Sequence, residues 1–238
     1  LMLGPTVYTF ALILAAFLLG LGLGAGTGSL VARVSRRPRF ALGVCQSLLI
    51  GAVAWAAWGI SATLPYLPVS TSLAPGPWYM FQLDLMRCLW VVLPAACLWG
   101  ASFPLALAAA AAPGEDAGGL AGRVYAANTA GAIAGALAFS LVLVPGLGTR
   151  QSQGVIVVLS AVAALAALTP PMRGLRPRLL AAATAMAAAA AVALTVPGIP
   201  WEVVGYGRHS LNMRGFADPL YVGEGINSSV AVSKLHHG

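Results

Sequence analysis

The pattern of hydrophobic and polar positions divides the chain into long apolar runs separated by short polar or charged segments. A helix that spans a membrane needs about 20 mostly apolar residues, and six stretches qualify, although the fifth is short. They cover residues 7–31, 40–64, 80–109, 124–145, 155–169 and 179–196. The sixth is rich in alanine, which lies near the threshold of membrane insertion, so a soluble or interfacial helix is the alternative there.

The segment from residue 198 to residue 238 has a different pattern. A glycine-rich turn at residues 223–225 precedes positions where Val230 and Val232 alternate with Ala231 and Ser233. Alternation next to turn residues is typical of a β-hairpin, and two strands alone do not form a stable core. The sequence therefore predicts an all-α integral membrane bundle of about six transmembrane helices over residues 1–197. A linker and the first hairpin of a further domain follow over residues 198–238, and both chain ends suggest a piece of a longer protein.

Composition supports the membrane assignment. Hydrophobic residues make up 59% of the chain and charged residues 8%, whereas soluble domains carry roughly 25% charged residues. The net charge of +7 does not indicate nucleic-acid binding, because most of the positive residues lie between or at the ends of apolar runs. The low content of charged residues also argues against a water-soluble or disordered protein. The expected partner is the lipid bilayer, and the expected location is the plasma (inner) membrane of a bacterium.

The arginines predict the orientation of the spans. The first, third and fifth connections carry eight of them: Arg33, Arg36, Arg37, Arg39, Arg123, Arg173, Arg176 and Arg178. The second and fourth connections carry only Arg150. Because positive residues favour the cytoplasmic side, the arginine-rich connections are expected there. If the sixth segment crosses, the tail lies on the opposite side.

Two spans carry small residues at every fourth position, which allows helix backbones to approach closely in lipid. The predicted helix-packing residues are Gly20, Gly24, Gly28, Ala127, Gly131 and Gly135. A substrate path along such a face is the alternative. Asn128, in the fourth span, is expected to form a hydrogen bond with a neighbouring helix.

Asp84 and Arg87 are three residues apart in the third span, a spacing that allows an ion pair on one helical face. Charged residues within spans are candidates for function. Both lie near the outer end of the span, where they are expected to reach the interface. A structural pair and a transport or proton-transfer role both remain open.

No catalytic, cofactor-binding or metal-binding residue is predicted. The acidic pair Glu115 and Asp116 is expected in a solvated loop, and the histidines have no metal-site spacing. The chain contains no dinucleotide-binding glycine motif, no Walker loop and no nucleophile elbow. The cysteines Cys45, Cys88 and Cys97 are expected to be small buried residues.

Several stretches resemble the membrane-fused spermidine synthase-like proteins. These are residues 122–135 (GRVYAANTAGAIAG), 143–148 (LVPGLG), 98–104 (LWGASFP) and 15–24 (AAFLLGLGLG). In the tail, residues 220–225 (LYVGEG) and 228–232 (SSVAV) resemble the opening of the synthase-like domain. The resemblance implies a membrane region similar to part of a major-facilitator transporter, followed by a polyamine aminopropyltransferase-like domain.

The resemblance does not imply an active site within these residues. In the family, the glycine-rich loop that binds the aminopropyl donor and the catalytic Asp lie downstream of the hairpin. Soluble spermidine synthases carry a Tyr-Gln pair near this hairpin, where this chain has Asn227 and Ser228. No aminopropyl transfer is therefore expected from this chain by itself, and no cofactor is expected to bind to it.

The function expected from the resemblance is to anchor a downstream synthase-like domain to the membrane. One alternative is a major-facilitator-like transporter of a small substrate, with cations among the candidates. Another is a purely structural anchor. The parent enzyme would transfer a propylamine group from decarboxylated S-adenosylmethionine to a diamine, but S-adenosyl donors are cytoplasmic and the predicted topology places the tail outside. The substrate and the oligomeric state are left open.

Overall fold

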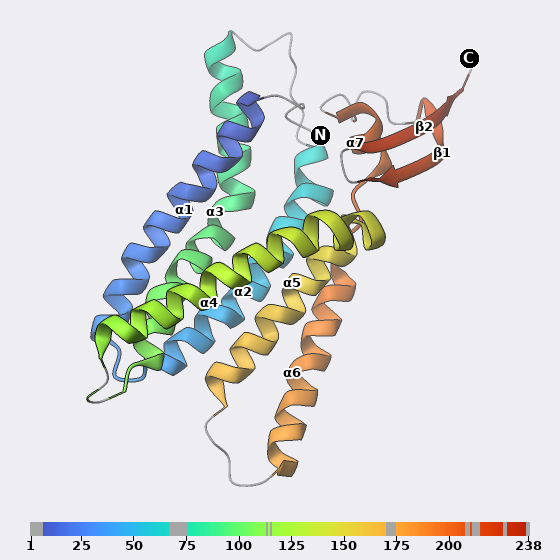
Figure 1. The fold of residues 1–238 in the computed structure, drawn as a ribbon. Coiled ribbons are helices and arrows are strands. Elements are labelled where there is room, and N and C mark those ends of the chain that lie inside the picture. The colour runs from blue at the N-terminus through green and yellow to red at the C-terminus, as the bar shows by residue number, and fades with distance from the viewer. Residues whose placement is uncertain are drawn as a thin grey trace.

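The computed structural model describes residues 7–66, 76–112, 114, 116–169, 175–207, 210, 215–225 and 228–236. They form a mostly helical bundle with a two-stranded sheet at one end (Figure 1). The helices are α1 (Val7–Val34), α2 (Pro38–Trp58), α3 (Pro77–Ala110), α4 (Ala117–Ala138), α5 (Val144–Leu168), α6 (Leu175–Thr195) and α7 (Trp201–Tyr206). The remaining elements are the π-helical turns η1 (Gly59–Thr63) and η3 (Phe139–Leu143), the 3-10 turn η2 (Leu64–Tyr66), and the strands β1 (Ala217–Glu224) and β2 (Ser229–Leu235). The predicted combination of a helical bundle and a hairpin is confirmed.

Within the part of the chain that the structure describes, four helical stretches are long and apolar enough to cross a membrane: Val7–Val34, Pro38–Thr63, Pro77–Ala110 and Ala117–Leu168. The last of these is not straight, because Gly148 interrupts it with φ 81° and ψ 166°. Glycine adopts this left-handed φ readily because it has no Cβ. The chain reverses there, so that α4 and α5 run in opposite directions (Figure 1). The sequence predicted a break between residues 145 and 155, and the reversal lies within that interval.

The bundle is built around α2 and α3. Helix α1 packs on α3, α2 packs on α3 and α5, and α6 packs on α5. The largest buried cluster joins four helices through Leu49 and Val53 of α2, Ala95 of α3, Val157 of α5 and Ala189 of α6. The alanines of this cluster, Ala95 and Ala189 among them, allow the helices to approach closely, as is common in membrane bundles.

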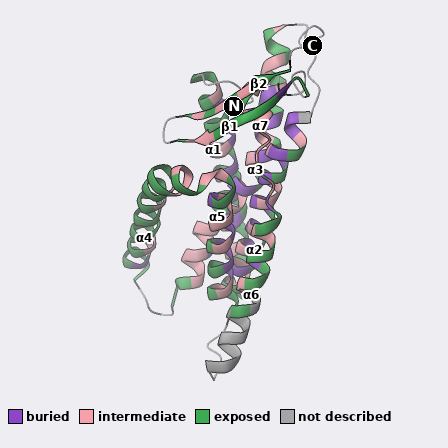
Figure 2. Cartoon of the chain, turned by 90° about the vertical axis from the view of Figure 1, so that its right-hand side faces the viewer, coloured by how far each residue is buried: buried purple, intermediate pink, exposed green. Residues whose placement is uncertain are grey.

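Helix α4 stands apart from the other helices (Figure 2). Leu120 is its buried residue, whereas large apolar side chains such as Ile133 and Leu137 are 58% and 56% exposed. Exposed apolar side chains also cover α1 and α5. Apolar surface of this extent marks contact with a membrane or with another protein.

The two ends of the bundle differ in charge. The connections α1–α2, α3–α4 and α5–α6 lie at one end, and the hairpin, α7 and the reversal at Gly148 lie at the other (Figure 1). Arg39 donates from Nη2 to the Ala166 carbonyl at 3.3 Å, which joins the start of α2 to the end of α5. Most of the connecting arginines therefore lie at the end opposite the hairpin. Arg173 lies outside the described residues.

Strands β1 and β2 form an antiparallel hairpin with an irregularity between Pro219 and Tyr221. The turn follows Glu224, later than the predicted residues 223–225, because Gly223 pairs with Val230 within the ladder. The predicted alternation is present along β2. Val230 and Val232 are exposed, and Ala231 and Ser233 are half-buried.

Candidate functional site

The glycines of α1 lie directly against the backbone of α3. Gly20, Gly24 and Gly28 are buried, and a Cβ added at Gly24 would overlap the Cys97 carbonyl group. A Cβ at Gly28 would lie 2.6 Å from Cα of Ala101. Gly22, on another face of α1, has no atom within 4 Å of the equivalent position. The three buried glycines, which we call the α1 glycine face, allow the α1–α3 contact to form at backbone distance.

Asp84 and Arg87 lie one turn apart on α3, and Arg87 Nη1 lies 3.6 Å from Asp84 Oδ1. The two residues are only 2% and 7% exposed. The prediction that they reach the interface is therefore wrong. Residues of α1, of the η1–η2 turn and of the segment 199–203 line a cavity together with Arg87. Charges with this degree of burial are expensive and require pairing.

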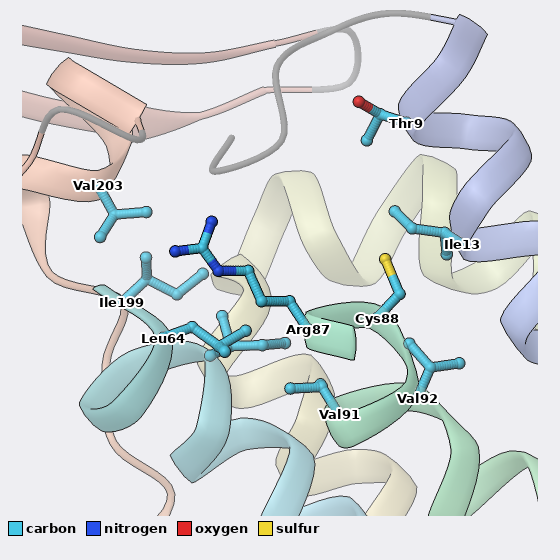
Figure 3. Close-up of a pocket in the computed structure, with 10 residues that line it drawn as sticks. Thr9, Ile13, Leu64, Arg87, Cys88, Val91, Val92, Ile199 and Val203 are labelled. Carbon is cyan, nitrogen blue, oxygen red and sulfur yellow. The ribbon is translucent and has the colours of Figure 1, made fainter. Parts of the chain in front are cut away.

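A cavity of about 230 Å³ lies beside this pair, and we call it the Arg87 cavity. Thr9 and Ile13 of α1, Ile60 and Leu64 of the η1–η2 turn, and Ile199 and Val203 near α7 line it, together with Arg87, Cys88, Val91 and Val92 of α3. Its walls are almost entirely apolar. Figure 3 shows the Arg87 guanidinium directed between α3 and the α7 segment, toward Ile199 and Val203. The arrangement places one member of the buried Asp84–Arg87 ion pair at the edge of an apolar space.

Helix α4 does not form the predicted contacts within the chain. Gly131 and Gly135 have no atom within 4 Å of an added Cβ, and Ala127 is exposed. Asn128 is exposed as well, so the expected hydrogen bond to a neighbouring helix is not formed among the described residues. These predictions fail because α4 leans away from the bundle, where no other described helix faces it (Figure 2).

A polar contact between α2 and α3 was missed at the sequence level. Gln46 donates from Nε2 to the Ser102 hydroxyl at 3.0 Å, and Ser102 donates to the Leu98 carbonyl at 2.8 Å. Polar side chains between membrane helices stabilise their association by about 1 kcal/mol each. Gln46, an amide within an apolar run, was the signal that could have identified this contact.

The hairpin is attached to the bundle through Glu224. Its Oε2 atom accepts hydrogen bonds from the Thr149 backbone N–H at 2.6 Å and from the Thr149 hydroxyl at 2.5 Å. Thr149 directly follows the reversal at Gly148, and the long part of α5 begins there. A carboxylate at the first turn of a helix also interacts favourably with the helix dipole. Sequence reasoning missed this contact because 75 residues separate the two partners.

Two further contacts join elements at the end of the bundle that carries the hairpin. Arg150 donates from Nε to the Val196 carbonyl at 2.8 Å, just beyond the last turn of α6. The hydroxyls of Tyr206 and Ser233 lie 2.9 Å apart, which joins α7 to β2. The half-buried side of β2 therefore packs on α7, and its valine-bearing side faces away.

His236 and Asp218 form an exposed pair across the hairpin, with Nε2 and Oδ2 2.7 Å apart. The hydrogen bond to Asp218, with a further one to the Gly215 carbonyl, raises the pKa of His236 above its ordinary value of 6.5. Among the described residues, no group of three His, Cys, Asp or Glu side chains is placed to hold a metal. Glu115, His209 and His237 lie outside the described residues.

The His236–Asp218 pair predicts a pH dependence of the hairpin. Because the folded pKa is raised, the pair contributes stability below the ordinary pKa of 6.5, and this contribution is lost as the pH rises through the folded pKa. An NMR titration of His236 should give a midpoint above 6.5. Asp218→Asn should move the midpoint back toward that value, and an unchanged midpoint in this variant would contradict the assignment.

Comparison of the chain with protein-family models, with curated proteins and with solved structures found no match.

Proposed function

We propose that this chain is the membrane-embedded region that anchors a spermidine synthase-like domain, which begins at the β1–β2 hairpin. The observation that carries this proposal is the pair of hydrogen bonds between Glu224 and Thr149. Glu224 belongs to the LYVGEG stretch that resembles the opening of the synthase-like domain. It binds Thr149, the residue that directly follows the LVPGLG stretch. One stretch that carries the resemblance thus binds the residue next to another such stretch.

The open surface of the hairpin supports the same proposal. Tyr221 pairs with Val232 and Gly223 pairs with Val230, so these residues share one face of the sheet. Tyr221, Val230 and Val232 are 61%, 49% and 47% exposed. A two-stranded sheet with an exposed apolar face needs further strands or helices for stability. In the proposal, the synthase-like domain supplies them.

The proposed anchor has six spans, with α4 and α5 as the fourth and fifth and α6 as the sixth. The hairpin then faces the side opposite the arginine-rich connections. A synthase-like domain there is separated from cytoplasmic S-adenosyl donors. The proposal assigns an anchoring role to this chain and no aminopropyl transfer, because the donor-binding loop and the catalytic Asp of the family lie downstream of the hairpin.

The coding sequence beyond residue 238 tests this proposal. It should continue with a glycine-rich loop and a following acidic residue, the donor-binding and catalytic features of the family. A stop codon or an unrelated domain at that position would contradict the proposal. The purified chain by itself should form no spermidine from decarboxylated S-adenosylmethionine and a diamine, and detectable product would show that these residues contain an active site.

The attachment of the hairpin can be measured by amide hydrogen exchange in nanodiscs. Glu224→Gln removes a charged acceptor whose hydrogen bonds contribute about 1.5–3 kcal/mol, so the β1 and β2 amides should exchange at least about tenfold faster. Glu202→Gln, in the first turn of α7, is the matched control and should leave exchange in the hairpin unchanged. Equal exchange in the Glu224→Gln variant and the unsubstituted chain would show that this contact does not hold the hairpin.

A further inference from the structure

The connection between α1 and α2 concentrates positive charge at the end of the bundle opposite the hairpin (Figure 1). Its cations are all arginines, and we call them the arginine turn: Arg33, Arg36, Arg37 and Arg39. All of them are exposed. Arg39 is held by its hydrogen bond to the Ala166 carbonyl, whereas none of the ion pairs among the described residues involves the other three. The charge of the turn is therefore not neutralised by an ion pair within the described part of the chain.

The start of α2 adds to this positive charge. The Arg37 backbone N–H donates to the Ser35 hydroxyl at 3.2 Å, and α2 then begins with no acidic residue in its first turn and no hydrogen bond from a capping side chain. The N-terminus of a helix carries the positive end of the helix dipole. The dipole and the guanidinium groups therefore attract an anion to the same turn.

Exposed apolar side chains lie on both sides of Arg36 and Arg37. Val34 is 84% exposed and Phe40 is 60% exposed. Apolar groups beside cations match the boundary between the acyl chains and the headgroups of a bilayer. A soluble anion such as phosphate would leave these apolar side chains in water, so the surface fits a lipid better than a free anion.

We propose that the arginine turn binds the phosphate headgroup of an anionic phospholipid, with Val34 and Phe40 against its acyl chains. Clusters of arginine next to the end of a membrane helix are typical of anionic lipid recognition, and guanidinium groups form charge-assisted hydrogen bonds with phosphate oxygens. A zwitterionic headgroup carries a positive group that the arginines repel, so the turn selects the anionic lipid. This inference rests on the proposed membrane-embedded role of the chain, but it does not depend on the domain that follows the hairpin.

Native mass spectrometry of the full chain tests this inference. The chain is equilibrated in micelles that contain equal amounts of phosphatidylglycerol and phosphatidylcholine, and the lipids that stay bound are compared. One arginine near an anionic headgroup strengthens binding about fivefold. The chain should therefore prefer phosphatidylglycerol at least about tenfold. Equal binding of the two lipids would overturn the proposal.

Substitutions at the two ends of the bundle locate the site. Arg36→Gln/Arg37→Gln removes two of the exposed cations and should reduce the preference for phosphatidylglycerol to less than about threefold. Lys234→Gln removes an exposed cation of β2, at the opposite end of the bundle, and should change the preference by less than about twofold. Helical circular dichroism verifies that both variants are folded. An undiminished preference in the arginine variant would place the lipid elsewhere and overturn the proposal.

Glycerol phosphate distinguishes a lipid from a soluble anion, because it carries the phosphate group without acyl chains. Added in about tenfold excess over the lipid, it should leave phosphatidylglycerol bound, since only the lipid also contacts the apolar side chains. Displacement of the lipid would show that the turn binds soluble phosphates and would overturn the lipid assignment.

Failure of the membrane-embedded role would have a different signature. The chain would then stay folded and soluble after removal of the detergent. Loss of the lipid preference in a chain that still requires detergent would contradict the arginine turn as the lipid site and leave the proposed anchoring role intact.

Discussion

Gly24→Leu is expected to destabilise the bundle more than any other single substitution in α1. The Cβ position at Gly24 overlaps the Cys97 carbonyl on α3, and a backbone group cannot move aside as a flexible side chain can. The two helices must separate, which also disrupts the α1–α3 contact along the rest of the α1 glycine face. Overpacking usually costs about 1–3 kcal/mol. We expect a loss of at least about 3 kcal/mol in the free energy of unfolding, because the clash is with backbone.

The chain provides a control two residues away. Gly22 is exposed and has no atom within 4 Å of an added Cβ, so Gly22→Leu should change the free energy of unfolding by less than about 0.5 kcal/mol. Unfolding in mixed micelles, followed by helical circular dichroism, measures both variants. Similar destabilisation by the two substitutions would mean that helix propensity or lipid contact, and not the α1–α3 contact, determines the change in the free energy of unfolding.

Asp84→Asn is the second substitution that we expect to lower the free energy of unfolding strongly. It removes the carboxylate that lies 3.6 Å from the Arg87 guanidinium while that guanidinium remains buried. Removal of one member of a buried ion pair typically costs about 3–5 kcal/mol. The same unfolding measurement should show a loss of this size.

Replacement of both charged residues distinguishes the stability gained from the ion pair from the cost of burying a single charge. Asp84→Leu/Arg87→Met keeps the site filled with apolar groups, and such replacements are often neutral or stabilising. The double variant should therefore be more stable than Asp84→Asn. Gln82→Ala, an exposed position in the same region of α3, should change stability by less than about 0.5 kcal/mol. A double variant less stable than Asp84→Asn would show that the pair stabilises the fold beyond the cost of an isolated charge.

The helical elements were predictable because hydrophobic runs of membrane length leave the backbone no alternative to helix. The α1 glycine face also has a local signal, the spacing of four residues. The same spacing at Gly131 and Gly135 predicted a helix contact that α4 does not form within the described residues. The spacing shows which face of a helix carries small residues, but it does not show whether a partner helix lies against that face.

The surroundings of Arg87 include residues far from it in sequence. Ile13 lies in α1, and Ile199 follows α6. Sequence position placed the pair near the end of a span, which favours exposure, and only the assembled bundle brings these distant residues to the same cavity as Arg87. The same reason explains why the contact between Glu224 and Thr149 was not predicted.

The side of the membrane on which the hairpin lies tests the central claim most directly. In a variant without native cysteines, a single cysteine is introduced at Ser228, beside the hairpin turn, or at Ser35, between α1 and α2. A membrane-impermeant maleimide is then applied to sealed right-side-out vesicles. We predict that Ser228→Cys is labelled in intact vesicles and that Ser35→Cys is labelled only after permeabilisation. Labelling of both positions from the same side would contradict a membrane-spanning bundle with its hairpin opposite the arginine-rich connections.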